Sequence, residues 1–410
     1  MSERVRIAFV VQRYGLEVCG GAELHCRLVA ERLASHFEVH VLTTTALNYL
    51  PWDNYYQPGD SALNGVFVHR FPVDKKREHP AFDNLTRRVF GGPHTYFDEL
   101  EWLRNVGPHS TGLLDHINRQ RDRFAAFIFF TYQYSHTYFG LQLVPDKAIL
   151  IPTAHDEPTL YLSAYRPLFH LPRFIAYNTH SERSLVQWLF GNSHVPSLVV
   201  GTGVEVPEGG DPDRFRSRHN LAGDLIVYLG RIEAAKGCPQ LFSYFSRYRD
   251  EVGRPATLVL MGKAEMPIPQ RPDMVSLGFV SDQEKADGLA AAALLIAPSQ
   301  HESLSMTCLE AWQQGRPVLV NGQCQVLKDN CVHSNGGLYY SSYEEFAACL
   351  EVLLSSPRLR SRLGEAGRAY AQANYGWGVI ERKYLQMIAH VVGAECFEPA
   401  LRRREASEKC

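Results

Sequence analysis

The most informative segment of this chain is Pro298-Ser-Gln-His-Glu302-Ser-Leu-Ser-Met-Thr-Cys-Leu-Glu310-Ala-Trp-Gln-Gln-Gly315-Arg-Pro-Val-Leu-Val320. An apolar run at 293–297 ends just before it, a polar loop holds Glu302, and a helical pattern then stops at Gly315 before the apolar run at 317–320. Short apolar runs suit strands that are covered on both faces, and a helix between two of them indicates a right-handed βαβ unit. The stretch therefore predicts part of an α/β domain with a parallel sheet.

The same alternation of apolar runs and helical patterns extends over both halves of the chain. In the first half, the predicted strands are 5–11, 37–43, 66–71, 125–131, 147–152, 173–177 and 197–201, and the predicted helices include 21–35 and 179–190, the latter with Ser181 as its N-cap. In the second half, the predicted strands are 225–229, 256–261, 274–278, 293–297 and 317–320, and the predicted helices are 238–249, 282–292, 305–315 and 343–355. The stretch 202–223, rich in Gly, Pro, Asp and Arg, predicts a linker. The sequence thus predicts two doubly wound α/β domains, with a ligand cleft lined by the carboxyl ends of both sheets.

The composition is that of a globular enzyme. Hydrophobic residues make up 45% and charged residues 21% of the 410 residues, a length that suits two domains. The net charge is −2, and residues 1–200 hold 19 basic against 19 acidic residues, which leaves 23 against 25 in the remainder. Because a nucleic-acid-binding protein is expected to show a basic excess, no nucleic-acid partner is predicted.

The nine cysteines are scattered along the chain without a Cys-x-x-Cys pair. This pattern indicates neither a disulfide framework nor a zinc site, and it favours a reducing compartment. Cys324, Cys331 and His333 come nearest to a metal-ligand cluster, with buried free thiols as the alternative interpretation. We therefore predict a cytoplasmic protein without a bound metal.

Two observations bear on membranes. The first apolar run is short and closed by Arg13, and the charge-free segment 124–145 is too polar to span a bilayer, so both predict elements of a folded core. Short basic clusters at 75–77, 87–88 and 402–404 leave two interpretations open. They are either ordinary solvated surface or a weak peripheral contact with anionic lipid headgroups at the inner face of the membrane.

The two glutamates of the opening stretch are candidates for ligand binding. Glu302 and Glu310 are eight positions apart, about 12 Å if the whole interval were helical, which resembles the distance from a sugar to a ribose across a diphosphate. Backbone amides at the start of the helix, from Ser303 through Leu304 and Ser305 to Met306, would offer the positive end of the helix dipole to a diphosphate or a sugar oxygen. A capped surface helix with two solvated glutamates is the alternative.

A second candidate is Leu229-Gly230-Arg231-Ile-Glu-Ala-Ala-Lys236-Gly237, where a strand gives way to a helix. An arginine can donate two parallel hydrogen bonds to phosphate, and a lysine acts as a mobile point charge. Arg231 and Lys236 could therefore neutralise a departing diphosphate without a metal. Two exposed cations at a helix start are the alternative, although the helix dipole disfavours cations there.

Two weaker candidates lie in the first half. Gly20 and Gly21, in Cys19-Gly20-Gly21-Ala22-Glu23, permit close backbone approach to a ligand, but Gly-Gly is also an ordinary turn, and Gly-x-Gly-x-x-Gly is absent there. His155 follows a predicted strand directly, from where it could hydrogen-bond a sugar or the acceptor. Its position, rather than its residue type, singles it out among the 17 histidines.

Taken in order, these segments resemble glycosyltransferase family 4, the group 1 retaining enzymes of the GT-B fold. The resemblance runs from the first strand to about residue 390, and its parts are Gly20-Gly21-Ala22-Glu23, Thr153-Ala-His155-Asp156, Gly230-Arg231 with Lys236-Gly237, Leu277-Gly278-Phe279-Val280, and Pro298-Ser299 through Glu310-Ala311 to Gly315-Arg-Pro-Val318. It implies two Rossmann-like domains that face each other across a cleft. The acceptor-side domain would comprise 1–202 plus 378–410, including a closing helix at 378–392 that crosses back, and the nucleotide-sugar-binding domain would comprise 203–377.

The resemblance also implies a role for each candidate. Arg231 and Lys236 would hold the donor diphosphate, Glu302 the sugar hydroxyls, Glu310 the ribose, His155 the transferred sugar, the amides near Phe279 and Val280 the base, and those of Gly20 and Gly21 the phosphates. The donor would be a UDP-, GDP- or dTDP-sugar, and no cofactor is expected. Where the family usually has glycines after its first glutamate, this chain has Ser303-Leu304-Ser305, which restricts the backbone of that loop.

The resemblance therefore implies a retaining transferase that moves a hexose-type sugar to a glycan or lipid-linked acceptor, in bacterial surface polysaccharide synthesis. Aromatic residues of the long irregular segment 44–116, namely Trp52, Tyr55, Tyr56, Tyr96, Phe97 and Trp102, either stack on sugar rings or pack the loops. Alternatives on the same fold are a nucleotide-sugar epimerase and a glycan phosphorylase, and a non-catalytic nucleotide- or carbohydrate-binding protein is an alternative from another class.

Overall fold

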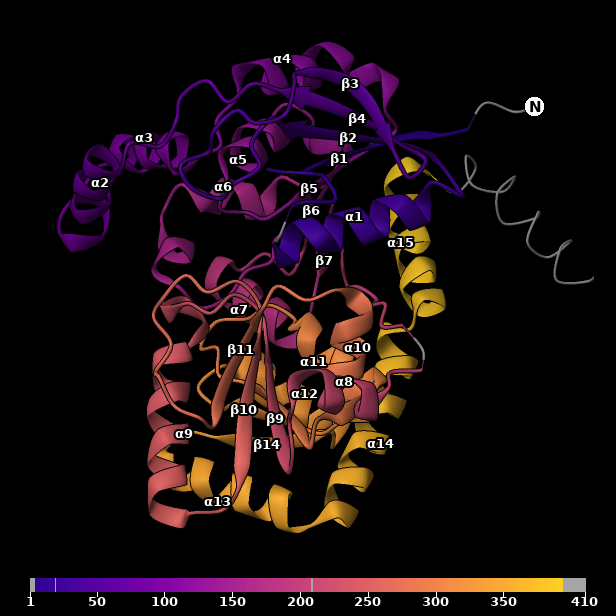
Figure 1. Cartoon of the computed structure of the whole chain (residues 1–410). Helices are drawn as coiled ribbons and strands as arrows, with labels where there is room; N and C mark the ends of the chain where they lie inside the picture. Colours follow the sequence, from indigo (N-terminus) through magenta and orange to yellow (C-terminus); the bar gives the residue numbers. More distant parts are fainter. Residues whose placement is uncertain (1–3, 19, 208, 394–410) are drawn as a thin grey trace, which may run out of the picture. The chain divides into compact units, whose positions relative to one another are not determined.

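The computed structural model describes residues 4–18, 20–207 and 209–393 (Figure 1). The chain forms two compact units, with boundaries in the sequence between residues 202 and 203 and between 379 and 380. Unit 1 takes the residues before the first boundary and after the second, and unit 2 takes 203–379. Cys19, at the head of the Gly-Gly loop, and the basic cluster 402–404 lie outside the described residues.

Unit 1 is built on an eight-stranded sheet flanked by helices (Figure 1). Its strands are β1 (Arg6–Val10), β2 (Glu38–Thr44), β3 (Gly59–Leu63), β4 (Val66–Phe71), β5 (Ala126–Phe130), β6 (Ala148–Ile151), β7 (Phe174–Tyr177) and β8 (Ser197–Val199). Its helices are α1 (Gly21–Leu33), α2 (His79–Gly91), α3 (Tyr96–Val106), α4 (Thr111–Gln120), α5 (Ser135–Leu141), α6 (Tyr165–His170) and α7 (His180–Phe190), with short 3-10 turns η1 (Arg121–Arg123), η2 (Pro145–Lys147) and η3 (Pro158–Tyr161). The strand order is β3-β4-β2-β1-β5-β6-β7-β8, and all neighbours are parallel except β3 and β4.

The apolar runs form the centre of this sheet, as predicted. Phe9 of β1 pairs with Val41 of β2 on one side and with Ile128 of β5 on the other, and all three are fully buried. Parallel strands covered on both faces need such unbroken apolar sequence, because both faces bury their side chains. Their carboxyl ends lie at one edge of the sheet, where the loops that carry Gly20 and His155 begin.

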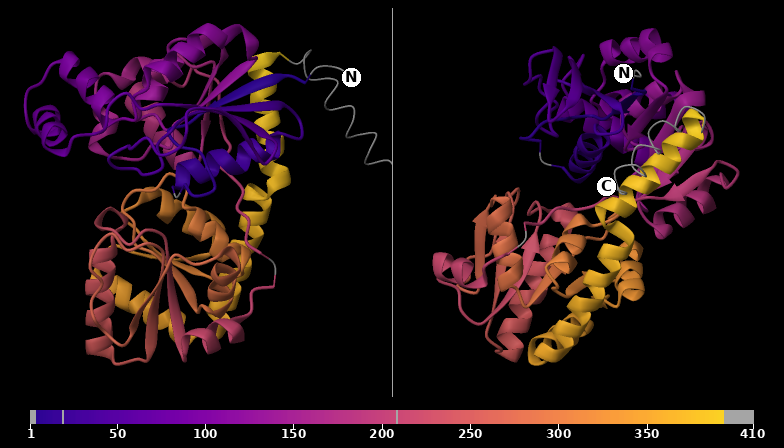
Figure 2. Two further views of the ribbon diagram at one scale, coloured as in Figure 1. Left: turned by 45° about the horizontal axis from the view of Figure 1, so that its top comes forward. Right: turned by 90° about the vertical axis from the view of Figure 1, so that its right-hand side faces the viewer.

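Unit 2 is built on a six-stranded parallel sheet of order β11-β10-β9-β12-β13-β14, with helices on both sides of it (Figure 2). Its elements are α8 (Pro212–His219), β9 (Asp224–Leu229), η4 (Ala234–Lys236), α9 (Cys238–Val252), β10 (Ala256–Met261), β11 (Met274–Gly278), α10 (Asp282–Ala291), β12 (Leu294–Ala297), α11 (Met306–Gln313), β13 (Val318–Asn321), α12 (Gln325–Ser334), β14 (Gly337–Tyr340), α13 (Tyr343–Ser355) and α14 (Pro357–Tyr375). The order reverses between β9 and β12, which is where ligands of doubly wound folds bind.

The last helix, α15 (Trp377–Val392), begins in unit 2 and belongs to unit 1 from Ile380 onward. It lies beside α1, as both figures show (Figures 1 and 2). Tyr384 and His25 form a buried hydrogen bond of 2.9 Å between these two helices. Burial lowers the pKa of His25 to about 3, so this imidazole is neutral at physiological pH.

Several local predictions were wrong. The stretch 202–223 is not only a linker, because it contains α8, whose single buried residue is Phe215 and which therefore lacks an apolar stripe. The N-cap of α7 is Thr179 rather than Ser181: the Thr179 hydroxyl accepts the amide of Glu182 at 3.2 Å. The segment 44–116 is not irregular either, since it contains β3, β4, α2, α3 and the start of α4.

Candidate functional site

The centre of the candidate site in unit 2 is an ion pair between two predicted residues. The Lys236 ammonium donates to Glu302 Oε1 at 2.8 Å, and the two side chains are 32% and 19% exposed. Gly237, at φ +75°, brings their loops together, because a Cβ at this position would lie 2.3 Å from the carbonyl oxygen of Pro298. The loops that follow β9 and β12, adjacent strands of the sheet, thus present one cation and one carboxylate side by side.

Arg231, the other predicted phosphate ligand, lies in the same loop but makes a different contact. Its guanidinium pairs with Glu233 at 3.1 Å and is 43% exposed, while its carbonyl accepts the Tyr228 hydroxyl at 2.6 Å. The backbone of Arg231 is therefore anchored and its side chain remains accessible. An exposed pair of this kind is weak, so an anionic ligand can replace Glu233 as its partner.

Glu310 occupies a more enclosed position on α11. Its carboxylate is almost fully buried and accepts the ammonium of Lys285, on α10, at 2.8 Å. Burial raises the pKa of Glu310 above its ordinary value, although Lys285 opposes this shift. Among the described residues, Lys285 is the one donor to this carboxylate, which leaves its other oxygen as an acceptor.

The loop between the glutamates leads into the first turn of α11. Leu304 is buried and its carbonyl accepts the Asn330 amide group at 3.2 Å, whereas Ser305 is the N-cap residue with φ +69°. Ser303 is partly exposed and lies with Leu304 in a bend before the helix, whereas Met306 is the first helical residue. Of the four residues predicted at the helix start, only Ser305 and Met306 therefore lie there. A serine in the left-handed region is strained, because its Cβ approaches the following carbonyl oxygen.

The remaining predicted residue pair of unit 2 follows β11. Phe279 is 78% exposed and Val280 is partly buried, just after Gly278, which has φ +69°. An aromatic side chain this exposed is accessible to a ligand, while the predicted contact between a base and the backbone amides here stays a prediction.

The predicted residues of unit 1 lie at the carboxyl edge of its own sheet. His155 follows β6, is 29% exposed at its side chain, and faces Glu157 Oε1 at 3.4 Å. Gly20 is the N-cap residue of α1, and a side chain there would overlap the carboxylate of Glu23 unless that carboxylate moved. Gly21 begins the helix in open surroundings, because a Cβ added there would meet no atom of the described residues within 4 Å.

Sequence reasoning missed three residues that organise these edges. Arg13 donates to Glu23 at 2.8 Å and to the carbonyl of Leu47 at 2.9 Å, in a buried pair beside Gly20. Lys285 holds Glu310, and Glu182 holds the loop that carries His155. Only the Thr179-x-x-Glu182 spacing, which is typical of a helix start, signalled one of them in the sequence.

Trp52 and Trp102 are buried, so these two aromatic residues pack the core of unit 1, while Tyr55, Tyr96 and Phe97 are exposed.

The basic cluster 75–77 is partly neutralised: Lys75 pairs with Glu78, Lys76 with Asp53, and Arg77 lies over the Phe82 ring. None of the helices in the described ranges is long and apolar enough to cross a membrane.

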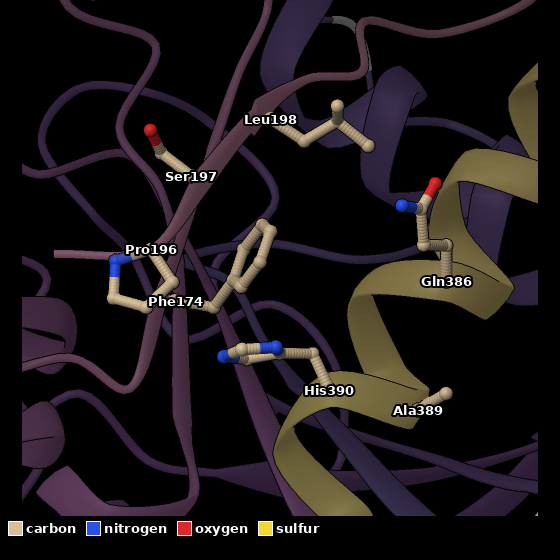
Figure 3. Close-up of a pocket in the computed structure, with 7 residues that line it drawn as sticks. All are labelled: Phe174, Pro196, Ser197, Leu198, Gln386, Ala389 and His390. Carbon is tan, nitrogen blue, oxygen red and sulfur yellow. The ribbon is translucent and has the colours of Figure 1, made fainter. Parts of the chain in front are cut away.

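A hollow of about 500 Å³ opens on unit 1 where β7 and β8 meet α15 (Figure 3). The His390 ring lies edge-on to Phe174, with 5.3 Å between ring centroids. The hollow is lined by Phe174, Pro196, Ser197, Leu198, Gln386, Ala389 and His390. No predicted site residue lines this hollow, so it is separate from the candidate site.

A segment of unit 2 matches a family of known proteins. Residues 223–356 match the family model of group 1 glycosyl transferases, and this segment includes Arg231, Lys236, Glu302 and Glu310. The D-inositol 3-phosphate glycosyltransferase of Frankia alni is 28% identical over 286 residues, which cover 63% of this chain and 68% of that protein. These matches indicate glycosyltransferase activity.

Solved structures agree on the fold. Sucrose-phosphate synthase from Thermosynechococcus elongatus superimposes with a TM-score of 0.70 at 17% identity, over 95% of this chain and all of that one. HepE from Anabaena, in complex with UDP-glucose, superimposes with a TM-score of 0.67 at 14% identity, over 95% of this chain and 99% of that one. The predicted GT-B fold, with two parallel-sheet α/β domains, is confirmed.

Proposed function

We propose that the chain transfers a hexose-type sugar, with retention of configuration, from a nucleoside-diphosphate donor to a glycan or lipid-linked acceptor in bacterial surface polysaccharide synthesis. The observation that carries the proposal is the pair of Lys236 and Glu302 in the segment that matches the group 1 glycosyl transferases. An accessible lysine and carboxylate suit the two ends of a sugar-diphosphate bond. The lysine suits the phosphate oxygens, and the carboxylate suits the sugar hydroxyls.

In this mechanism unit 2 binds the donor. As the bond to the sugar breaks, negative charge grows on the diphosphate, and fixed positive groups lower the barrier. Lys236 and Arg231 supply that charge, together with the first-turn amides of α11. When Lys236 turns to the diphosphate, Glu302 loses its partner and becomes an acceptor for sugar hydroxyls.

Other residues of unit 2 orient the nucleotide. The second oxygen of Glu310 accepts a ribose hydroxyl, and the backbone near Phe279 and Val280 meets the base. Unit 1 contributes His155, which contacts the transferred sugar, and the amides of Gly20 and Gly21, which contact phosphate. In this proposal no protein carboxylate acts as a nucleophile, and the acceptor is deprotonated in part by the departing phosphate.

The test is a panel of UDP-, GDP- and dTDP-sugars, beginning with UDP-glucose. Each is scored for thermal stabilisation and for slow release of nucleoside diphosphate without acceptor. A ligand at about 100 times its Kd stabilises the folded protein by about 2.7 kcal/mol, which is readily measured. Product analysis completes the test: an epimerised donor, or no response to any nucleotide sugar, contradicts the proposal.

A further inference from the structure

Two threonines at the carboxyl edge of the first sheet have unusual backbone conformations. Thr131 follows β5 with φ +65°, and Thr153 follows β6 with φ +51°. The Thr153 hydroxyl donates to that of Thr131 at 3.2 Å. A β-branched residue in the left-handed region is a genuine outlier, and such outliers gather at functional sites where the surrounding structure enforces them. Thr153 is two residues before His155.

Glu182 supplies the enforcing contact. From the first turn of α7, its Oε1 accepts the amide of Ala154 at 2.6 Å, and its Oε2 accepts the amide of Asn178 at 2.5 Å. The side chain is 1% exposed. One buried carboxylate thus joins the loop after β6, which carries His155, to the loop after β7.

Helix capping alone does not account for this arrangement. A capping glutamate satisfies amides at the start of its own helix, as Glu182 does with Asn178. The contact with Ala154 reaches 28 residues back in the sequence, to a different strand. Burial raises the pKa of Glu182, whereas the backbone N–H groups that donate to its two oxygens favour the ionised carboxylate and oppose that rise, so the position is costly for a carboxyl group.

We propose that Glu182 is a positioning residue that acts through His155, by holding the Ala154 amide and with it the strained backbone of the His155 loop. The inference rests on the proposed function, in which His155 contacts the transferred sugar. A carboxylate is required because both of its oxygens accept. A glutamine offers one acceptor, and its amino group would face the second backbone N–H.

The experiment compares Glu182→Gln with Thr179→Ala. Thr179→Ala removes a cap from the same helix and leaves the Ala154 contact in place, so it controls for loss of helix stability. We expect Glu182→Gln to speed amide hydrogen exchange in a peptide covering 152–157 by about tenfold, since one of the two acceptor oxygens is replaced by an amino group, and Thr179→Ala to leave it unchanged. This readout needs no substrate.

Turnover provides the second readout. With the nucleotide sugar that the panel identifies, Glu182→Gln should lower kcat about tenfold with KM within about twofold, while Thr179→Ala keeps the wild-type kcat. If Glu182 acts through His155, the double variant His155→Ala/Glu182→Gln should be no slower than His155→Ala alone. Should Glu182→Gln fail to fold, Thr153→Gly serves instead, because it lets the same loop relax while the acceptors of Glu182 remain.

The outcomes separate the two claims. A His155→Ala variant with wild-type turnover refutes the proposed role of His155, and the positioning role falls with it. If His155→Ala is impaired but Glu182→Gln has normal loop exchange, or adds its full effect in the double variant, the positioning role alone is refuted.

Discussion

The two glutamates of the stretch 298–320 are both paired with a lysine at 2.8 Å, yet the pairs differ in burial. Lys236 and Glu302 are 32% and 19% exposed, whereas Lys285 and Glu310 are 18% and 8% exposed. An exposed ion pair contributes about 0–1 kcal/mol to stability, but breaking a buried pair costs about 3–5 kcal/mol. The comparison indicates that the first pair can exchange its partners for a ligand, while the second is a fixed part of unit 2.

The largest effect is expected on stability from Lys285→Met. This change leaves the buried Glu310 carboxylate without its partner, and the free energy of unfolding should fall by about 3 kcal/mol. Chemical denaturation followed by tryptophan fluorescence measures the loss. Lys263→Met, which breaks an exposed pair with Glu265, is the matched control and should change stability by less than about 1 kcal/mol. If both variants lost the same free energy of unfolding, the distinction between buried and exposed ion pairs would not hold for this protein.

Lys236→Ala should have the opposite effect: a large loss of turnover with little loss of stability. Removing one fixed positive group from an anion site typically costs about 2.7–4 kcal/mol of transition-state stabilisation, so kcat should fall by about 100- to 1,000-fold. Stability should change by less than about 1 kcal/mol, because the pair with Glu302 is partly exposed. Steady-state kinetics and a melting curve on the same sample give both numbers, and near-normal turnover would refute the assigned role.

A pH series separates the contribution of Glu310 to stability from its proposed contact with the ribose. Burial raises the pKa of this carboxyl above its ordinary value of 4.5. Its contribution to stability is therefore full below pH 4.5 and is lost as the pH rises through the folded-state pKa. An ionised carboxylate accepts a ribose hydroxyl more strongly than the protonated acid does, so the proposed contact predicts that nucleotide affinity rises as the pH rises.

Calorimetric titration measures the nucleotide affinity at each pH. The titrant is UDP, GDP or dTDP, according to which nucleotide sugar the panel identifies. On lowering the pH from 7 to 5, affinity should weaken by at most about tenfold per pH unit. Glu310→Gln should bind more weakly at pH 7 and lose this part of the pH dependence. Identical pH profiles for the two proteins would show that Glu310 does not bind the ligand.

Features of the fold and of the site were predictable from the sequence where they depend on local sequence patterns. Most of the strands were predictable because each contains a short apolar run, and α11 was predictable from its position between two of them. The edge strand β3, with sequence GDSAL and four exposed residues, has no such signal and was missed. Local pattern likewise predicted Glu302 and Glu310 as the notable residues of their segment.

The partners of those residues were not predictable, because packing chooses them. Lys285 lies 25 positions before Glu310, and although it is the one basic residue of α10, no short-range pattern relates it to a glutamate on α11. Ser181 was chosen as the N-cap of α7 because serine is a common cap, although Thr179 is the residue with a glutamate three positions later. That same glutamate also holds Ala154, which no short-range pattern reveals.

Ser305 offers the smallest and most direct test of the loop that joins the two pairs. Ser305 adopts a left-handed conformation with φ +69°, which glycine adopts without strain. A glycine at this position can therefore keep the same backbone conformation. Ser305→Gly should relieve this strain and stabilise the protein by about 0.5–1 kcal/mol, after the greater entropy of glycine in the unfolded chain is counted. The Lys236 and Glu302 contact should persist, so kcat should remain within about threefold of wild type, because the chemistry depends on that pair and not on the serine side chain. A melting curve and a turnover assay decide the matter: if Ser305→Gly is less stable, the hydroxyl contacts with Thr307 and Cys308, at 3.3 Å each, outweigh the backbone strain.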